Sequence, residues 1–122
     1  MTLADAVSAH VEALRYGGGL EGVSNIDNLA GAIGRPYHGY HRSIARKSAA
    51  LLHGVASSHG FADANKRTAW LLTFLLIDRS GYILDLQPDD RIDDVAVAIV
   101  EGTMSQVELV AWFDQKLMVR AA

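Results

Sequence analysis

Residues 59–81 read HGFADANKRTAWLLTFLLIDRSG, and the apolar half of this stretch decides the expected fold. The run 69–77 would be apolar on every side of a helix, which is typical of a helix that other helices surround. It is also much shorter than the ~20 residues needed to cross a bilayer. The stretch therefore predicts a buried helix over about 64–80, with Asp63 as a candidate N-cap and Gly81 at its C-terminal end.

Apolar residues at three- and four-residue spacing predict further helices on both sides of this stretch. The first expected helix begins at Leu3 and is ended by the glycines at 17–19, the second covers 26–33 and is closed by Gly34, and the third runs from 44 to about 57–58. A later helix runs from Asp89 or Asp90 through Val100, and Gly102 stops it. Residues 82–86 are expected to form a brief extended piece. A last helix follows Ser105, which makes a capping-box pattern with Glu108, and its face includes Leu117.

The length and composition of the chain suit one helical domain. It has 122 residues, of which 50% are hydrophobic and 20% are charged. We expect an all-α fold, a single compact domain over residues 1–122 with five to seven helices. Cysteine is absent, which excludes disulfides, thiolate metal sites and cysteine nucleophiles. The N-terminus MTLADAVSAH lacks the regions of a secretory signal, so we expect a cytoplasmic protein with no membrane partner.

Charge is distributed unevenly along the chain. The formal net charge of −3 argues against a general nucleic-acid binder, and we expect no direct binding of nucleic acid. Within 34–67, however, Asp63 is the one acidic residue among six basic ones: Arg35, Arg42, Arg46, Lys47, Lys66 and Arg67. This cationic middle favours a local anionic ligand. A solvated helix face is the alternative interpretation of the same count.

The start of the buried helix predicts an anion site. A helix that begins near Ala64 directs its unpaired amides and the positive end of its dipole at whatever lies in front, and phosphate is the usual occupant. Asn65, Lys66 and Arg67 fall in the first turn, where cations are normally unfavourable. The two cations therefore favour a bound anion that compensates them. Ordinary solvated charges are the alternative for both side chains.

The loop before this helix supplies groups for proton transfer and metal binding. His59, with an ordinary pKa of about 6.5, is a candidate general base near neutral pH. Asp63 is a hard oxygen ligand suited to Mg²⁺ on phosphate oxygens, and Phe61 is expected to insert into the core. Such groups suit phosphoryl or nucleotidyl transfer. A purely structural interpretation makes His59 a partner of the preceding helix's carbonyls and Asp63 only an N-cap.

The nine residues HGFADANKR, 59–67, resemble the motif of the Fic/Doc family, and of its Doc (death-on-curing) toxin branch in particular. Weaker similarity covers RYGGG, IGR and EGTMS, which begin at residues 15, 33 and 101. Typical Fic adenylyltransferases carry glycine where Lys66 stands and a second arginine where Trp70 stands, and both differences match the Doc pattern. The resemblance implies a minimal Fic fold with a flap loop or short hairpin.

The similarity to the Doc branch implies a protein kinase. Such a toxin binds ATP with Mg²⁺ and transfers the γ-phosphate to a threonine hydroxyl of translation elongation factor Tu, which arrests protein synthesis. An antitoxin protein, a separate chain that folds on binding, would restrain it. The open alternatives are an adenylyltransferase that uses the same residues to transfer AMP, and a non-catalytic protein that binds a partner through the flap and the cationic loop.

The resemblance also implies a role for each motif residue. His59 would deprotonate the target hydroxyl, Asp63 would hold Mg²⁺ and Phe61 would form the motif core. The residues that would bind the transferring phosphates, together with the helix amides, are Ala64, Asn65, Lys66 and Arg67. The loop 35–41 matches by position the flap that aligns the target peptide by main-chain pairing. Its candidate target-binding residues are Arg35, Pro36, Tyr37 and His38.

Overall fold

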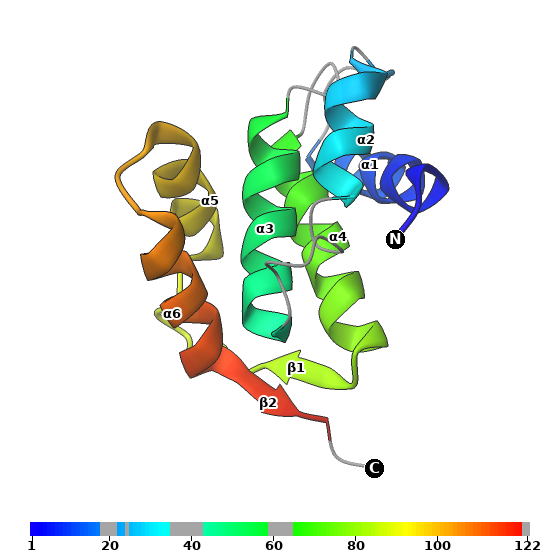
Figure 1. The fold of residues 1–122 in the computed structure, drawn as a ribbon. Coiled ribbons are helices and arrows are strands. Elements are labelled where there is room, and N and C mark those ends of the chain that lie inside the picture. The colour runs from blue at the N-terminus through cyan, green and yellow to red at the C-terminus, as the bar shows by residue number, and fades with distance from the viewer. Residues whose placement is uncertain (18–21, 24, 35–42, 59–64, 121–122) are drawn as a thin grey trace.

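Helix α4 (Asn65–Arg79) lies at the centre of the structure, as its apolar sequence predicts (Figure 1). None of the residues 68–77 is exposed, and Leu72 and Thr73 are completely buried. The hydroxyl of Thr73 donates to the Ala69 carbonyl at 2.7 Å, so this buried polar group has a partner. The prediction of a helix surrounded by other helices is confirmed.

The computed structural model describes residues 1–17, 22–23, 25–34, 43–58 and 65–120, which form six helices and one pair of strands. Besides α4, the elements are α1 (Leu3–Gly17), α2 (Ile26–Gly34), α3 (Ile44–Ser57), β1 (Tyr82–Leu84), α5 (Ile92–Glu101), α6 (Gln106–Lys116) and β2 (Leu117–Val119). The predicted helical domain is thus confirmed, and the first three expected helices end where the sequence predicts, at Gly17, Gly34 and Ser57. Within these residues, none of the helices combines the length and the apolarity needed to cross a bilayer.

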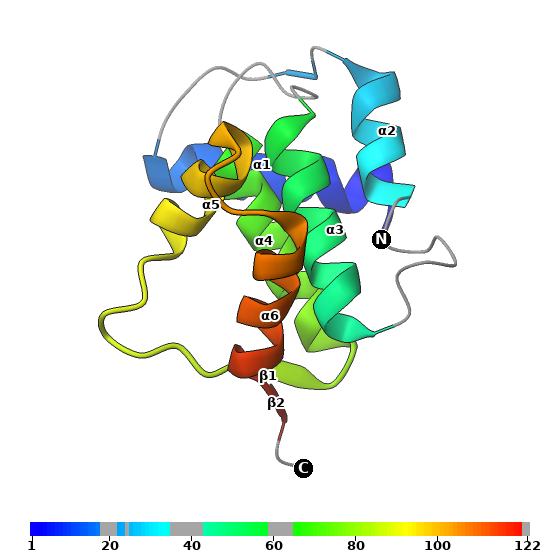
Figure 2. The same cartoon turned by 60° about the vertical axis from the view of Figure 1, so that its left-hand side comes forward.

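Helices α3 and α4 lie side by side and run in opposite directions (Figures 1 and 2). Helix α1 packs on α4, α2 packs on α3, and α5 with α6 covers another face of α3. Ser43 caps the start of α3, where its hydroxyl accepts from the Arg46 amide at 3.1 Å. The core between these helices is apolar, with Leu51, Leu52 and Val55 of α3 completely buried.

An aromatic cluster joins α4 to the C-terminal helices. The ring of Trp70 lies 5.5 Å from Phe74, 5.9 Å from Trp112 and 6.0 Å from Phe113, measured between centroids. Its indole N–H donates to the Ile92 carbonyl at 2.9 Å, at the start of α5. Such tilted and edge-to-face pairs add to the free energy gained from burying the rings. Trp70 thereby connects α4, α5 and α6.

The C-terminal end of α6 differs from the prediction. The last helix was expected to include Leu117, but α6 ends at Lys116 and Leu117 begins β2. Leu117 pairs with Leu84 of β1 in an antiparallel register, and its backbone is extended (φ −74°, ψ 131°). Strand β2 was not predicted, whereas the extended piece after Gly81 is confirmed as β1.

The start of α5 also differs from the prediction, while its end is confirmed. Neither Asp89 nor Asp90 opens the helix, which begins at Ile92. The carboxylate of Asp90 accepts instead from the Gln87 amide and from Lys116 Nζ, both at 2.7 Å. It therefore closes a turn before the helix.

Two helix boundaries that the sequence predicts are confirmed, namely the end of α5 at Gly102 and the start of α6 after Ser105. Gly102 ends α5 in the left-handed conformation at φ 81°. At the start of α6, Ser105 and Glu108 form the complete capping box, with two bonds of 3.1 Å. These local signals act through neighbouring residues alone, which explains why the sequence revealed them.

The packing gathers three helix ends at one end of the molecule. The N-terminal ends of α2 and α4 lie there together with the C-terminal end of α3, while the β1–β2 sheet lies at the opposite end (Figure 1). The motif begins at residue 59, directly after the C-cap of α3, and its last three residues, 65–67, are the first residues of α4. The fold therefore brings the described part of the motif to the end that lacks the sheet.

The ion pair between Asp5 and Arg79 yields a prediction on pH dependence. Two bonds of 3.1 Å join these side chains and tie α1 to α4. The Arg79 guanidinium, together with the Thr2 amide, holds the pKa of Asp5 well below its usual value. A lowered folded-state pKa stabilises the protein above the unfolded pKa of about 4, and that stabilisation is lost as the pH falls further.

We therefore expect Arg79→Gln to lower the free energy of unfolding at pH 7, and the difference from wild type to shrink below about pH 4. Urea unfolding at a series of pH values measures this difference. Arg15→Gln is the matched control, because Arg15 pairs with Glu12 within α1 and on its surface. If the free energy of unfolding differs between Arg79→Gln and wild type by the same amount at pH 7 and at pH 3, Arg79 does not lower the pKa of Asp5.

Candidate functional site

The second half of the motif lies within the described chain, and the first half does not. Asn65, Lys66 and Arg67 form the first residues of α4. The other site residues predicted from the sequence lie outside the described residues; these are His59, Phe61, Asp63 and Ala64 of the motif, and Arg35, Pro36, Tyr37 and His38 of the flap. Their roles remain predictions.

The first turn of α4 contains no acidic residue. Helices α1, α2, α5 and α6 each have at least one there: Asp5, Asp27, Asp93 with Asp94, and Glu108. Helix α3 lacks one too, but the Ser43 hydroxyl caps its start. The positive end of the α4 dipole therefore receives no compensating charge from its own first turn, which leaves it suited to an anion.

Lys66 is the exposed cation at this helix end. Its side chain faces solvent, and within the described ranges it makes no hydrogen bond or ion pair. A lysine in this position carries an ammonium that can approach a phosphate as a point charge. Exposure also fits the alternative of a solvated charge, so both interpretations of Lys66 stay open.

Arg67 is half-buried and contacts α1. Its Nη1 donates to the Ala13 carbonyl at 2.7 Å, close to the C-terminal end of α1. A cation is favourable at that end of a helix, so α1 offsets part of the cost that the start of α4 imposes on this guanidinium. Arg67 is therefore not an ordinary solvated charge. The electrostatic argument for a bound anion therefore depends mainly on Lys66.

Position 70 contributes to the core and not to the site. The Trp70 side chain is 4% exposed and lies in the aromatic cluster with Phe74, Trp112 and Phe113. Its one N–H donor is bound to the Ile92 carbonyl. This position therefore supplies no cation to the N-terminal end of α4.

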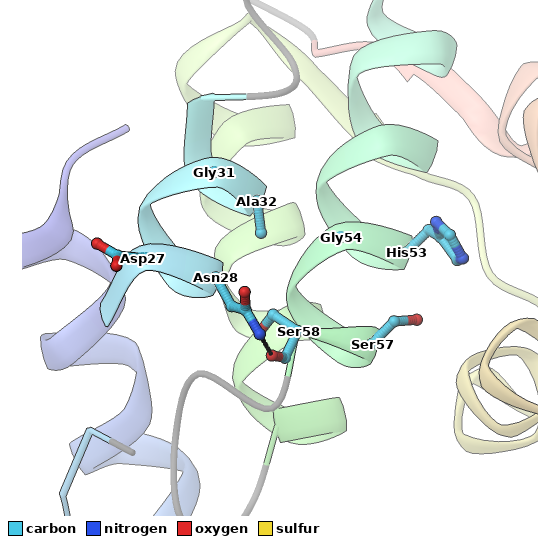
Figure 3. Close-up of a pocket in the computed structure, with 8 residues that line it drawn as sticks. All are labelled: Asp27, Asn28, Gly31, Ala32, His53, Gly54, Ser57 and Ser58. Atoms are coloured by element: carbon cyan, nitrogen blue, oxygen red, sulfur yellow. Dashed lines mark hydrogen bonds between the residues drawn. The ribbon is translucent and has the colours of Figure 1, made fainter. Parts of the chain in front are cut away.

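The end of α3, which leads into the motif, is fixed by several hydrogen bonds. Ser58 is the C-cap, and both its amide (3.3 Å) and its hydroxyl (2.9 Å) donate to the Val55 carbonyl. The Asn28 side chain of α2 donates from Nδ2 to the Ser58 carbonyl at 3.0 Å (Figure 3). These bonds satisfy polar groups that a helix end would otherwise leave without partners.

A pocket of about 330 Å³ lies beside this helix end, between α2 and α3 (Figure 3). Its lining is rich in small and polar side chains: Asp27, Asn28, Gly31, Ala32, His53, Gly54, Ser57 and Ser58. A Cβ added at Gly31 would meet no atom within 4 Å, so the small residues leave open space between the helices. Sequence reasoning did not identify this pocket, because its two walls come from helices that only the tertiary fold brings together.

The described residues contain no group of three or more His, Asp or Glu side chains that could hold a metal ion. The candidate magnesium ligand, Asp63, falls in the segment outside the described ranges. A Mg²⁺ bound to nucleotide phosphates needs only one or two protein carboxylates, since phosphate and water oxygens complete its shell. The residues are thus compatible with a metal that arrives with its nucleotide.

The comparison with known families found one match. The sequence profile of the Fic/DOC family matches residues 4–77, more than half of the chain. The matched region runs from α1 to the last turn of α4 and includes all nine motif residues. A search of curated proteins found no match. Helices α5 and α6 and both strands lie beyond the matched region, although Trp112 and Phe113 of α6 contact the Trp70 ring.

Because Arg67 contacts α1 and Lys66 does not, we expect a substitution of Arg67 to reduce stability more than a substitution of Lys66. We expect Arg67→Ala to lower the free energy of unfolding by about 1–2 kcal/mol, because a charged hydrogen bond to a backbone carbonyl is lost. Lys66→Ala is the matched control, and we expect its effect to stay within about 0.5 kcal/mol. Urea unfolding of both variants at pH 7 measures the difference. Equal effects of the two substitutions would contradict a structural role for Arg67.

Proposed function

The chain belongs to the Fic/DOC family, and on that premise we propose that it is a Doc-type toxin kinase that transfers the γ-phosphate of ATP to a protein hydroxyl. Proteins of this family transfer nucleotide-derived groups to other proteins, so the chain is a transferase. The observation that carries the proposal is the complete motif at residues 59–67, whose cations lie in the first turn of a buried helix, a turn that contains no acidic residue.

The proposed reaction divides its tasks among the motif residues. His59 acts as the general base that takes the proton of the acceptor hydroxyl, whose oxygen then forms the bond to the γ-phosphorus as the β–γ bond breaks and ADP leaves. Asn65, Lys66 and Arg67 bind the phosphates together with the Ala64 amide and the first amides of α4. A Mg²⁺ held by Asp63 would neutralise charge on the phosphates.

Two positions support phosphate transfer over AMP transfer. Lys66 replaces the glycine of typical adenylyltransferases, and its exposed ammonium adds bulk and charge where their nucleotide phosphates need room. Trp70 replaces their second arginine, and its buried ring offers no cation at that position. An AMP transferase that works with these residues would lack both features of the typical enzymes. The kinase therefore remains the preferred proposal, with AMP transfer as the second candidate.

The proposed target and partner follow from the similarity to Doc. The acceptor would be a threonine of translation elongation factor Tu, and its modification would arrest protein synthesis in the cytoplasm. The loop 35–41, with Arg35, Pro36, Tyr37 and His38, would align the target segment by main-chain pairing. Restraint would come from a separate antitoxin chain that folds on binding.

Removal of the proposed base tests the proposal directly. We expect His59→Ala to reduce phosphate transfer to purified elongation factor Tu by about 10²–10⁴-fold, because a general base contributes by that factor. ATP binding, measured by calorimetry with Mg²⁺, and thermal unfolding should stay close to wild type. Transfer at the wild-type rate would show that His59 is not the base. Wild-type protein that binds no ATP would instead favour the non-catalytic alternative.

Mass spectrometry of the modified target separates the two transfer reactions. We expect the wild-type product to gain the mass of one phosphoryl group and not that of AMP. Lys66→Gly removes the bulk and the charge beside the phosphates, so we expect the share of AMP-modified product to rise. Lys66→Ala is the control, because it removes the same charge with little gain in backbone freedom. Lys47→Gly would not serve as a control, because a glycine in α3 weakens that helix. An AMP product from the wild-type protein would overturn the kinase assignment.

A further inference from the structure

The pocket between α2 and α3 combines a buried floor with an exposed rim (Figure 3). Of the residues that line it, Ala32, Gly54 and Ser58 are buried, whereas Asp27 and Asn28 are exposed. A ligand can therefore enter from solvent and remove part of its surface from water. The volume of about 330 Å³ lies near the lower end of the range for ligand sites, ~300–1,000 Å³, which suits a small molecule or one long side chain.

Small residues keep this space open. Gly31 on α2 and Gly54 on α3 have no side chain, and Ala32 contributes only a methyl group. A Cβ added at Gly31 would meet no atom within 4 Å, so a larger side chain at this position would extend into open space. The two helices pack on each other elsewhere, and Leu29 of α2 and Leu52 of α3 are completely buried. The pocket is thus a local feature of a packed interface.

The charges around the pocket favour a cation. Asp27 carries the one carboxylate among the lining residues, none of which is lysine or arginine. It lies in the first turn of α2, and the positive end of that helix offsets about half of its charge. On the opposite wall, Gly54 and Ser57 belong to the last turn of α3, where the helix dipole adds about half a negative charge and that turn has no basic residue. The two walls together are therefore negative.

The pocket and the candidate anion site lie at the same end of the molecule, with opposite preferences for charge. The first two turns of α2 and the end of α3 form the pocket, and Lys66 and Arg67 lie in the first turn of α4 at that end (Figure 1). Asp27 would repel a phosphate group, so the pocket does not suit the triphosphate of ATP. The ring of His53 lies on the side of α3 that faces away from α2 (Figure 3). The pocket therefore suits a positively charged group of the second substrate, which is a protein.

We propose that the pocket binds an arginine side chain of the protein that accepts the phosphate, an inference that rests on the proposed function. A guanidinium is planar and has five N–H donors, so it can bond to a carboxylate on one wall and to carbonyl or hydroxyl oxygens on the other. Asp27 then determines which acceptor segment binds, and it does so without contacting the reacting atoms. Its loss should raise the KM for the protein acceptor and leave kcat and the KM for ATP almost unchanged.

A binding measurement tests the pocket without any enzymatic readout. In an NMR titration of the whole chain with N-acetyl-argininamide, we expect the backbone amide signals of Asn28, Gly31 and Gly54 to shift, and the neutral N-acetyl-glutaminamide to leave them unchanged. Asp27→Asn should weaken binding of the argininamide by about 3–10-fold, because a charged hydrogen bond is lost. Asp94→Asn is the matched control, since it removes an exposed carboxylate from the first turn of α5, outside the pocket. Equal binding by Asp27→Asn and wild type would overturn the inference.

A larger side chain on α2 tests whether the probe occupies the pocket itself. Gly31→Leu fills the space, and Gly34→Leu is the control, because a Cβ at either position would meet no atom within 4 Å but Gly34 is not among the lining residues. We expect Gly31→Leu to weaken binding of the argininamide by at least about tenfold and Gly34→Leu to leave it unchanged. Circular dichroism should show that both variants are folded. Binding that persists in folded Gly31→Leu would contradict the assignment of the pocket.

Transfer kinetics decide whether the bound side chain belongs to the acceptor. With elongation factor Tu as the acceptor, we expect Asp27→Asn to raise the KM for this protein by about 3–10-fold, with kcat and the KM for ATP within about twofold of wild type. An unchanged KM for the protein would show that the pocket takes no side chain of the acceptor. If the wild-type chain transfers nothing from ATP to elongation factor Tu, the proposed function fails, and the argininamide titration still decides whether the pocket binds a cation.

Discussion

The burial of α4 is the constraint to which the rest of the molecule conforms. The side chains of residues 68–77 are buried or half-buried on every face of this helix, so α3, α1 and the aromatic residues of α6 must lie around it to remove its apolar groups from water. This packing fixes both of its ends. The C-terminal end meets the two-stranded sheet, and the N-terminal end is held beside the ends of α2 and α3 (Figure 1). Lys66 and Arg67 are therefore positioned by a helix that is packed into the core.

Most of the fold could be predicted because its signals are local. Apolar spacing, the capping box of α6 and the left-handed Gly102 each depend on residues a few positions apart. Strand β2 could not be predicted in this way. Leu117 continues the apolar spacing of a helix, and it becomes a strand because it pairs with Leu84, more than thirty residues away. The start of α5 shifted for a similar reason, since Asp90 binds the distant Lys116 and is thereby unavailable as a cap.

In the candidate site, too, the local features could be predicted from the sequence and the contacts between distant segments could not. The motif is a continuous stretch of nine residues, so a hypothesis about its chemistry could be drawn from its side-chain types and its resemblance to a known family. The bond from Arg67 to α1, the bond from Asn28 to Ser58 and the pocket between α2 and α3 all join segments that are distant in the sequence. No local pattern indicates them. The helix-dipole argument treated both cations alike, whereas the tertiary structure gives one of them a carbonyl partner and leaves the other in solvent.

The position of the β1–β2 sheet also decides where a probe can be attached. Strand β2 lies at the end of the molecule opposite to the N-terminal end of α4 (Figure 1). Its Met118 and Val119 side chains are exposed. A dye, an affinity tag or a surface linker attached to this strand would lie far from the end of the molecule that carries Lys66 and Arg67. A fusion before Met1 would alter more, because Met1 is partly buried against the core beside α1. Immobilisation through the sheet thus suits studies in which a large protein target must reach the motif.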